Sequence, residues 1–192
     1  NVSAFIQLKA EKKEQHFSFI RQFNLFQEIL AFYDEKKEPE LKAFLDLKRL
    51  HWAKEKSLLA DKDLLYLDAL TRLKDTYENE ASLHSIESSI ALHLYQLSQS
   101  EEYEKTQRIQ WRKSALATAK SLLEKQEKAY WKNLMARLKK EIEDPFFNAQ
   151  FPEHNFPNQK VLTKVSYRNK DHVYCKLYKV KPDESFNFLY QK

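Results

Sequence analysis

Glycine is absent from this chain of 192 residues. Phosphate-binding loops, dinucleotide fingerprints and the nucleophile elbow of hydrolases all need glycine where the backbone turns tightly or approaches a ligand. Its absence excludes these nucleotide-binding and hydrolase motifs. Glycine is also the residue that most often ends a helix, so we expect Asn, Lys and Pro to occupy the helix ends here.

Cysteine and long apolar runs are scarce as well. The single cysteine, Cys175, excludes an internal disulfide framework and a cysteine-rich zinc site. No stretch approaches the ~20 apolar residues that a membrane-spanning helix needs. Residues 1–15, NVSAFIQLKAEKKEQ, have no signal-peptide pattern and resemble the interior of a longer sequence. We therefore expect a processed form or a part of a larger protein.

Charge of one sign is in small excess only, with 33 basic and 28 acidic residues and a net charge of +5. The signs are interspersed, which favours a solvated helical surface over a nucleic-acid-binding surface. Hydrophobic residues make up 42% of the chain and aromatic residues 14%. This apolar content is enough to form a core, so we expect a folded protein.

Apolar residues recur at helical spacing over most of the first 143 residues. Within residues 14–37, two adjacent apolar lines predict a helix that its neighbours cover from two sides. The lines consist of Phe19, Phe23, Phe26, Leu30 and Tyr33, and of Leu25, Ile29 and Phe32. Pro39 is suited to the first turn of a second helix, which we expect to end near Ser57.

Four more helices are predicted after short connections. Asp61 and Ser82 are suited to cap the third and the fourth helix, whose apolar lines are Tyr66, Leu70, Leu73 and Tyr77, and Leu83, Ile86, Ile90, Leu94 and Leu97. The fifth is expected over residues 102–125 and the sixth over 127–143, and the weak boundary between them leaves one long helix open. Short connections make neighbouring helices antiparallel.

Small residues in the stretch RKSALATAKSLLEK are similar to those of a tetratricopeptide (TPR) helix, where they permit close approach of a neighbour. We therefore predict that residues 1–143 form a TPR-like α-solenoid of about six antiparallel helices. A closed helical bundle is the alternative. Most aromatic residues fall on the apolar seams, which favours core packing over an aromatic-lined peptide groove.

The pattern changes from helical to alternating after Pro145. Apolar and polar residues alternate over residues 161–167 and again over 173–177, as in two strands that each bury one face. If the two strands pair so that their apolar residues share one face, Val165 lies opposite Cys175. This pairing requires a connecting loop with an odd number of residues. We predict a β-hairpin in a second domain, residues 146–192. Because a lone hairpin is marginal in water, the rest of its sheet either packs on the helices or is missing from this chain.

The run FPNQKVLTKVSYRNKDHVYCKLYKV, which follows a helix ending in KKEIEDP, resembles the N-terminal region of bacterial α2-macroglobulin-like proteins, especially those of Bacteroidetes. The residues that carry the resemblance are Pro157, Asn158, Gln159, Val165 to Asn169, Val173, Tyr174, Leu177, Tyr178 and Lys179. The resemblance is specific in this region and only architectural over the helices. It implies that residues 146–192 are the incomplete start of the first macroglobulin-like β-sandwich.

The resemblance also implies a function for the full-length protein. Proteins of this family trap a protease that cuts an exposed bait segment, and some contain an internal thioester. Cys175 is followed by Lys-Leu-Tyr, so no thioester role carries over to it. The chain would be an N-terminal scaffold or interaction segment in the periplasm or outer membrane, with a lipid anchor outside this chain and a protease or another envelope protein as partner. The alternative is a free-standing helical-repeat module for protein–protein interaction.

Residues suited to catalysis or metal binding are few and scattered. His84 and Glu87 share a helix face but His93 lies on the opposite side, which favours surface histidines over a metal site. His172 and Cys175 are three residues apart in a predicted strand and would face opposite ways. We therefore expect a protein that is not an enzyme, without catalytic, metal-binding or cofactor-binding residues, and with neither nucleic acid nor a small-molecule substrate as partner.

Overall fold

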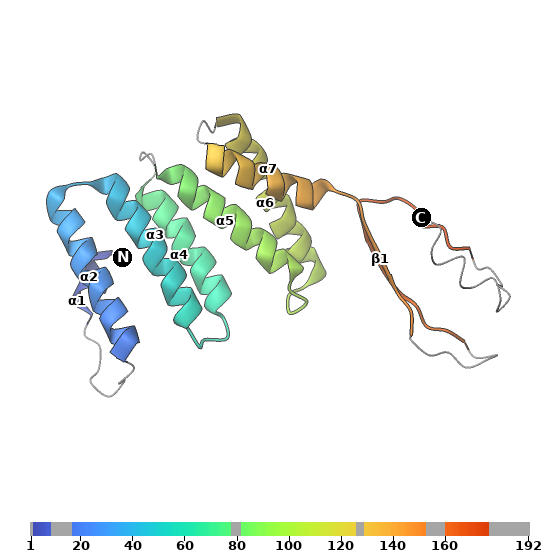
Figure 1. The fold of residues 1–192 in the computed structure, drawn as a ribbon, viewed down its shortest axis with the longest axis horizontal. Coiled ribbons are helices and arrows are strands. Elements are labelled where there is room, and N and C mark those ends of the chain that lie inside the picture. The colour runs from blue at the N-terminus through green and yellow to red at the C-terminus, as the bar shows by residue number, and fades with distance from the viewer. Residues whose placement is uncertain (1, 9–16, 78–81, 126–128, 153–159, 177–192) are drawn as a thin grey trace, which may run out of the picture. The chain divides into compact units, whose positions relative to one another are not determined.

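The computed structural model describes residues 2–8, 17–77, 82–125, 129–152 and 160–176, which form seven helices and two strands. The elements are α1 (Val2–Gln7), α2 (Phe17–Lys36), α3 (Pro39–Lys56), α4 (Lys62–Thr76), α5 (Leu83–Gln99), α6 (Lys105–Lys125), α7 (Ala129–Glu143), β1 (Phe146–Gln150) and β2 (Lys164–Arg168). The predicted class, an antiparallel helical array followed by a short β-hairpin, is confirmed (Figure 1). The chain divides into two compact units, Asn1–Ile142 and Glu143–Lys192.

Consecutive helices pack against each other in the first unit, and three apolar clusters join them in sets of three. The first cluster links α1, α2 and α3, the second links α3, α4 and α5, and the third links α5, α6 and α7. Helices α3 and α5 therefore each contribute to two clusters. Sharing a core only between neighbours is the packing of a helical-repeat array, so the closed-bundle alternative does not apply to this unit.

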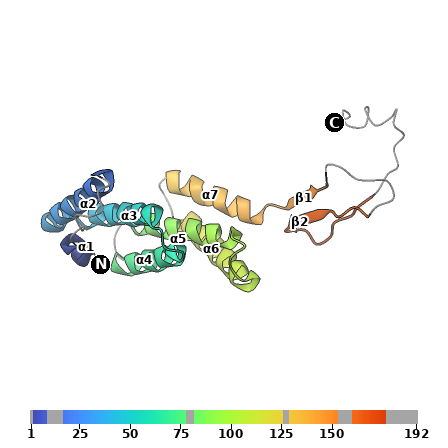
Figure 2. The same cartoon turned by 90° about the horizontal axis from the view of Figure 1, so that it is seen from below.

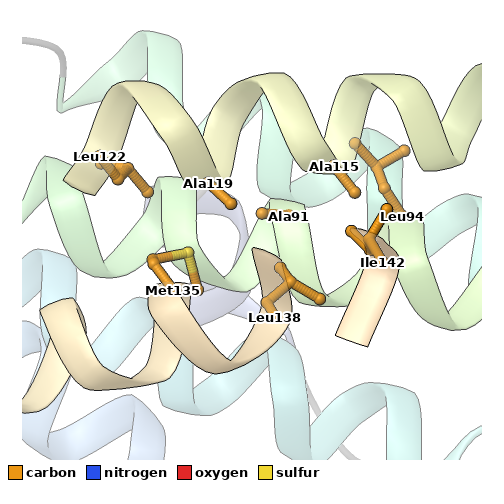
Figure 3. Packing of buried hydrophobic residues seen from close by; sticks show 8 residues of the cluster. All are labelled: Ala91, Leu94, Ala115, Ala119, Leu122, Met135, Leu138 and Ile142. Carbon is orange, nitrogen blue, oxygen red and sulfur yellow. The ribbon is translucent and has the colours of Figure 1, made fainter. Parts of the chain in front are cut away.

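The third cluster shows why small residues recur in α6. Ala115 and Ala119 of α6 and Ala91 of α5 are fully buried, and the larger Leu122, Met135 and Leu138 fill the space around them (Figure 3). An alanine side chain lets the backbones of two helices come close, while the long side chains of α7 close the layer from the other side. Helices α6 and α7 are separate elements, so the alternative of one long helix is wrong.

The end of α2 shows how a helix terminates without glycine. Lys37 has a left-handed backbone with φ of 56°. Its N–H donates to the Asp34 carbonyl, and the N–H of Glu38 donates to the Tyr33 carbonyl, both at 3.3 Å. These two bonds form a Schellman motif, in which glycine is the usual left-handed residue. The expectation that lysine takes this role is confirmed here, and Pro39 begins α3 as predicted.

The predicted helix boundaries at Asp61 and Ser82 are confirmed, but the predicted caps are not. Both residues occupy the N-cap position, of α4 and α5 respectively, and neither side chain makes a capping hydrogen bond. The ψ angles of 13° and −13° explain this result. A side-chain cap needs an extended backbone at the N-cap residue, and both residues are close to helical instead.

Among the described residues, helices cover α2 on one side only, so the prediction of cover from two sides is wrong there. Leu30 is fully buried against α1 and α3, but Leu25 is 54% exposed and Phe32 51%. Helix α1 was not predicted from the sequence, and its carbonyl groups accept hydrogen bonds from the Gln27 side chain. Helix α1 and α3 both pack on the Leu30 side, and the second apolar line faces outward.

The two strands form an antiparallel ladder in the second unit (Figures 1 and 2). The predicted strand containing Val165 exists, but its predicted partner is wrong. Val165 pairs with Ala149 and Tyr167 pairs with Phe147, both in β1, whereas residues 173–176 form no strand. In β1, Phe147 and Ala149 supply an alternating apolar face that matches β2, so residues 173–177 were not the only segment suited to pair with it. Pro157, Asn158, Gln159, Leu177, Tyr178 and Lys179 lie outside the described residues.

Candidate functional site

A groove runs along the junction of α3 and α4 in the first unit. It consists of two neighbouring hollows of about 160 Å³ and 490 Å³, which share Leu50 and Ala69 in their walls. The groove is lined from α3 by Lys42, Asp46, Arg49, Ala53 and Ser57, and from α4 by Lys62, Leu65, Ala69, Arg72 and Thr76. These positions recur every three or four residues, so each helix contributes one face.

The smaller hollow is mainly apolar. Leu50 and Ala53 of α3 and Leu65 and Ala69 of α4 line it together with the ring of Tyr66. Leu65, which lines this hollow, is 48% exposed. This end of the groove offers apolar surface that water covers at present, which favours binding of an apolar side chain.

The larger hollow carries charge. Asp46 is only 4% exposed, and Arg49 donates to its Oδ1 atom from Nε at 2.7 Å and from Nη2 at 2.6 Å. A buried carboxylate is stable only when such donors replace water. The Arg49 guanidinium also lies 4.6 Å from the ring centre of Phe5 in α1. These contacts hold the α3 wall of the groove in a fixed arrangement.

Two further ion pairs border the same hollow nearer to solvent. Lys42 is paired with Asp34 of α2, and Arg72 donates to Asp68 at 2.7 Å. Both Arg72 and Asp68 are more than half exposed, so each is free to exchange its partner for a group of a bound molecule at small cost.

A buried histidine lies behind the apolar end of the groove. His93 of α5 is 3% exposed. Its Nε2 atom lies 2.8 Å from the backbone carbonyl oxygen of Asp63, and its Nδ1 atom lies 3.2 Å from the Nζ atom of Lys54. The edge of Tyr66 meets its ring at a centroid distance of 4.8 Å. The imidazole thus joins α5 to α3 and α4.

The partners of His93 determine its tautomer. A carbonyl oxygen only accepts and an ammonium group only donates, so Nε2 carries the hydrogen and Nδ1 is an acceptor. Burial lowers the pKa of His93 below its usual value, and the nearby Lys54 ammonium lowers it further. Burial also raises the pKa of Tyr66 to about 12, with a smaller contribution from Glu55. Both side chains are neutral at pH 7.

The structure changes the interpretation of the candidate metal ligands. The prediction of surface histidines is wrong for His93, because α3 and α4 cover that side of α5 and supply polar partners. Glu87 pairs with Lys74 at 2.8 Å, and its predicted neighbour His84 is half-buried. No group of three or more His, Cys, Asp or Glu side chains within the described ranges is arranged to hold a metal ion.

His172 and Cys175 are both exposed. They lie in the segment after β2 that forms no strand, so the prediction that they face opposite sides of a strand does not apply.

The ladder presents a second candidate surface. Phe147, Ala149, Val165 and Tyr167 share one face of β1 and β2, because strand residues alternate and paired residues point the same way. Phe147 is 46% exposed, Val165 38% and Tyr167 58%. The opposite face pairs Asn148 with Ser166, Gln150 with Lys164 and Phe146 with Arg168, and is therefore mainly polar. The ladder is therefore amphipathic, and its apolar face is largely open to solvent.

The sequence analysis did not predict the groove or the His93 cluster. The groove depends on which faces of α3 and α4 meet, and periodicity within one helix does not contain this information. One signal was present: Asp46 occupies a position in line with buried residues of α3, and such a polar residue in an apolar face indicates a specific partner.

Comparison of the chain with models of known protein families, with curated proteins and with solved structures gave no match. Among the helices in the described part of the chain, none is both long and apolar enough to cross a membrane.

Proposed function

We propose that this chain is a protein-interaction scaffold whose helical array binds a peptide segment of another protein in the α3–α4 groove. The pair of adjoining hollows along α3 and α4 carries the proposal. Its smaller hollow accommodates an apolar side chain between Leu50 and Leu65, and its larger hollow offers charged groups that can exchange partners at the surface. Helical-repeat arrays typically bind extended partners along such inter-helix surfaces.

The charges of the lining favour an acidic partner. The walls contain five basic side chains, Lys42, Arg49, Lys54, Lys62 and Arg72, and two carboxylates, Asp46 and Asp68. A peptide that carries an apolar residue followed by carboxylates complements both hollows. The apolar residue supplies buried area, while the carboxylates fix the direction of binding and exclude basic sequences.

Selection from a random peptide display library at pH 7.5 tests this proposal. We expect enriched peptides to combine an apolar residue with Asp or Glu, and Ala69→Glu to weaken their binding at least tenfold. Ala69 lines both hollows, so a glutamate there fills the groove and repels carboxylates. Ala136→Glu on the exposed face of α7 is the matched control. Peptides that bind the Ala69→Glu variant as tightly as the original protein would contradict the proposal.

The exposed face of the ladder supports a second proposal, namely that the ladder begins a β-sandwich continued by further strands of a longer polypeptide. A sheet with one apolar face is stable when a second sheet covers that face. The resemblance to bacterial α2-macroglobulin-like proteins points in the same direction. The helical unit would then be the N-terminal scaffold of an envelope protein that traps proteases, and the groove would bind another part of that protein or an envelope partner.

Sequencing the gene downstream of the codon for Lys192 tests the second proposal. We expect several further segments with the alternating pattern of sandwich strands downstream of Lys192, and a bait segment among them. When such a longer product is purified, Val165 and Tyr167 should be protected from solvent. A stop codon directly after Lys192 would rule out this proposal and leave the peptide-binding scaffold as the function.

A further inference from the structure

The ammonium group of Lys54 joins three helices, and each of its hydrogens has an acceptor. Its Nζ atom lies 2.9 Å from Oδ1 of Asp63, 3.2 Å from Nδ1 of His93 and 3.3 Å from Oε1 of Gln96. The same ammonium lies 5.1 Å from the ring centre of Tyr66, and Lys54 also lines the groove. Lys54 is thus a direct link between the groove wall and the imidazole behind it.

A proton on Nδ1 would break this link. Neutral Nδ1 accepts a hydrogen bond from Lys54, but protonated Nδ1 has no free lone pair and presents an N–H to an ammonium group 3.2 Å away. The Oε1 atom of Gln96 lies 3.4 Å from Nδ1 and can accept the new N–H. Lys54 and the imidazolium would then compete for the Gln96 Oε1 atom. Because Lys54 has the longer and more flexible side chain, we expect Lys54 to move away.

The other groups around the ring do not prevent this exchange. From α4, the Asp63 carboxylate lies 4.0 Å from Nε2 and favours the imidazolium; Tyr66 is neutral and meets the ring with its edge. From α3, the His51 ring lies 6.4 Å from the Tyr66 ring, between centroids, and His51 pairs with Glu55 at 3.2 Å. Lys54 is therefore the cation that faces Nδ1, and its displacement relieves the repulsion.

We propose that His93 is a proton-operated latch of the α3–α4 groove: neutral His93 holds Lys54 against α5, and protonated His93 releases the Lys54 ammonium from α5 toward the groove, where Asp63 of α4 remains its partner. The proton comes from solvent and no covalent bond changes. Burial lowers the pKa of His93 below its usual value, so the latch is closed at pH 7 and opens only in more acidic solution than an ordinary histidine needs for protonation. A released cation adds positive charge to the groove, so binding of an acidic peptide tightens on acidification, and this consequence rests on the function proposed above.

Nuclear magnetic resonance of the whole chain without peptide tests the latch. We expect the His93 ring to hold the Nε2–H tautomer at pH 7.5 and to titrate below the usual range of histidine. Gln96→Leu removes the acceptor of the protonated state from an exposed position, so it should lower the midpoint further. Lys54→Met removes the opposing charge and should raise the midpoint. His51→Gln, at an exposed histidine, is the matched control and should leave the midpoint unchanged.

Amide exchange gives a second measurement that a merely structural role of His93 would not affect. Protonation of His93 should speed exchange near Lys54 and Gln96 about tenfold and leave α6 unchanged. A His93 midpoint that stays the same in both Gln96→Leu and Lys54→Met, or a midpoint at the usual histidine value, would overturn the latch.

Peptide binding separates the latch from the function on which its consequence rests. A peptide selected at pH 7.5 should bind the original protein at least threefold more tightly at pH 5.5, and His93→Gln, whose amide does not titrate, should abolish this change. Tight binding that does not depend on pH would refute the latch and leave the peptide-binding function in place. A His93 ring that titrates as expected in a protein that selects no peptide would refute only the function.

Discussion

Leu122, Met135 and Leu138 in the helical unit are at most 2% exposed, whereas Phe147 and Tyr167 in the ladder are 46% and 58% exposed. Both regions follow their apolar periodicity, but only the helices find neighbours within the described chain. A helix satisfies most of its backbone hydrogen bonds internally, so three helices suffice for a core. A two-stranded ladder leaves both edges and one apolar face unpaired. Periodicity therefore predicts which face is apolar, and the number of neighbouring elements decides whether that face is buried.

Separating the two units gives the largest expected effect. Residues 1–143 alone should unfold cooperatively at nearly the temperature of the whole chain, because all three helical clusters lie within them. Residues 144–192 alone should show no cooperative transition. Thermal unfolding followed by circular dichroism measures both. A cooperative transition in the short fragment would show that the ladder needs no further strands.

Truncation of one leucine in each region makes the same comparison with single side chains. Leu122→Ala should lower the free energy of unfolding by about 3 kcal/mol, because a leucine that is 1% exposed leaves a cavity behind. Leu162→Ala, at a leucine that is 87% exposed, should change it by less than about 0.5 kcal/mol. Urea unfolding of both variants is the measurement, and equal effects would contradict the burial contrast.

Two tyrosines extend the comparison to ionisation. The pKa of Tyr66 is raised to about 12, so its phenol is a weaker acid in the folded than in the unfolded protein, where the pKa is near 10. Its contribution to stability is complete below pH 10 and is lost as the pH rises towards 12. Tyr66→Phe should make the unfolding temperature fall less steeply over this range. Tyr174→Phe, at a residue that is 87% exposed, is the matched control in the same measurement.

A substitution on the open face of the ladder has the smallest expected effect in this chain. Tyr167→Thr should change the free energy of unfolding by less than about 0.5 kcal/mol, because Tyr167 contacts mainly solvent. In a longer product that completes a sandwich, the same substitution should cost about 2 kcal/mol, since the aromatic ring would be buried. Equal results in the two proteins would argue against a covering sheet.

The sequence predicted the helices well and the tertiary pairings poorly. Tyr66, Leu70, Leu73 and Tyr77 form the buried line of α4 as expected, because a strong helical period and burial reinforce each other. The partner of β2 was predicted incorrectly because two segments, 146–150 and 173–177, offered it an alternating face, and alternation alone does not rank them. The choice between them depends on contacts beyond the two strands.

The candidate site was less predictable than the fold. The His93 cluster joins positions from three helices, His93, Lys54 and Asp63, and the groove depends on the rotation of α3 against α4. Neither leaves a local pattern. The helical position of Asp46 among apolar residues was the one clue available, and it indicates a partner without naming Arg49.

The left-handed backbone at Lys37, with φ of 56°, and at Asn169, with φ of 54°, also bears on how this protein could be engineered. Left-handed geometry costs a residue with a side chain about 1 kcal/mol that glycine does not incur. Replacing Lys37 with glycine should therefore raise the unfolding temperature. Thermostable variants should be sought at this turn before the apolar clusters are redesigned.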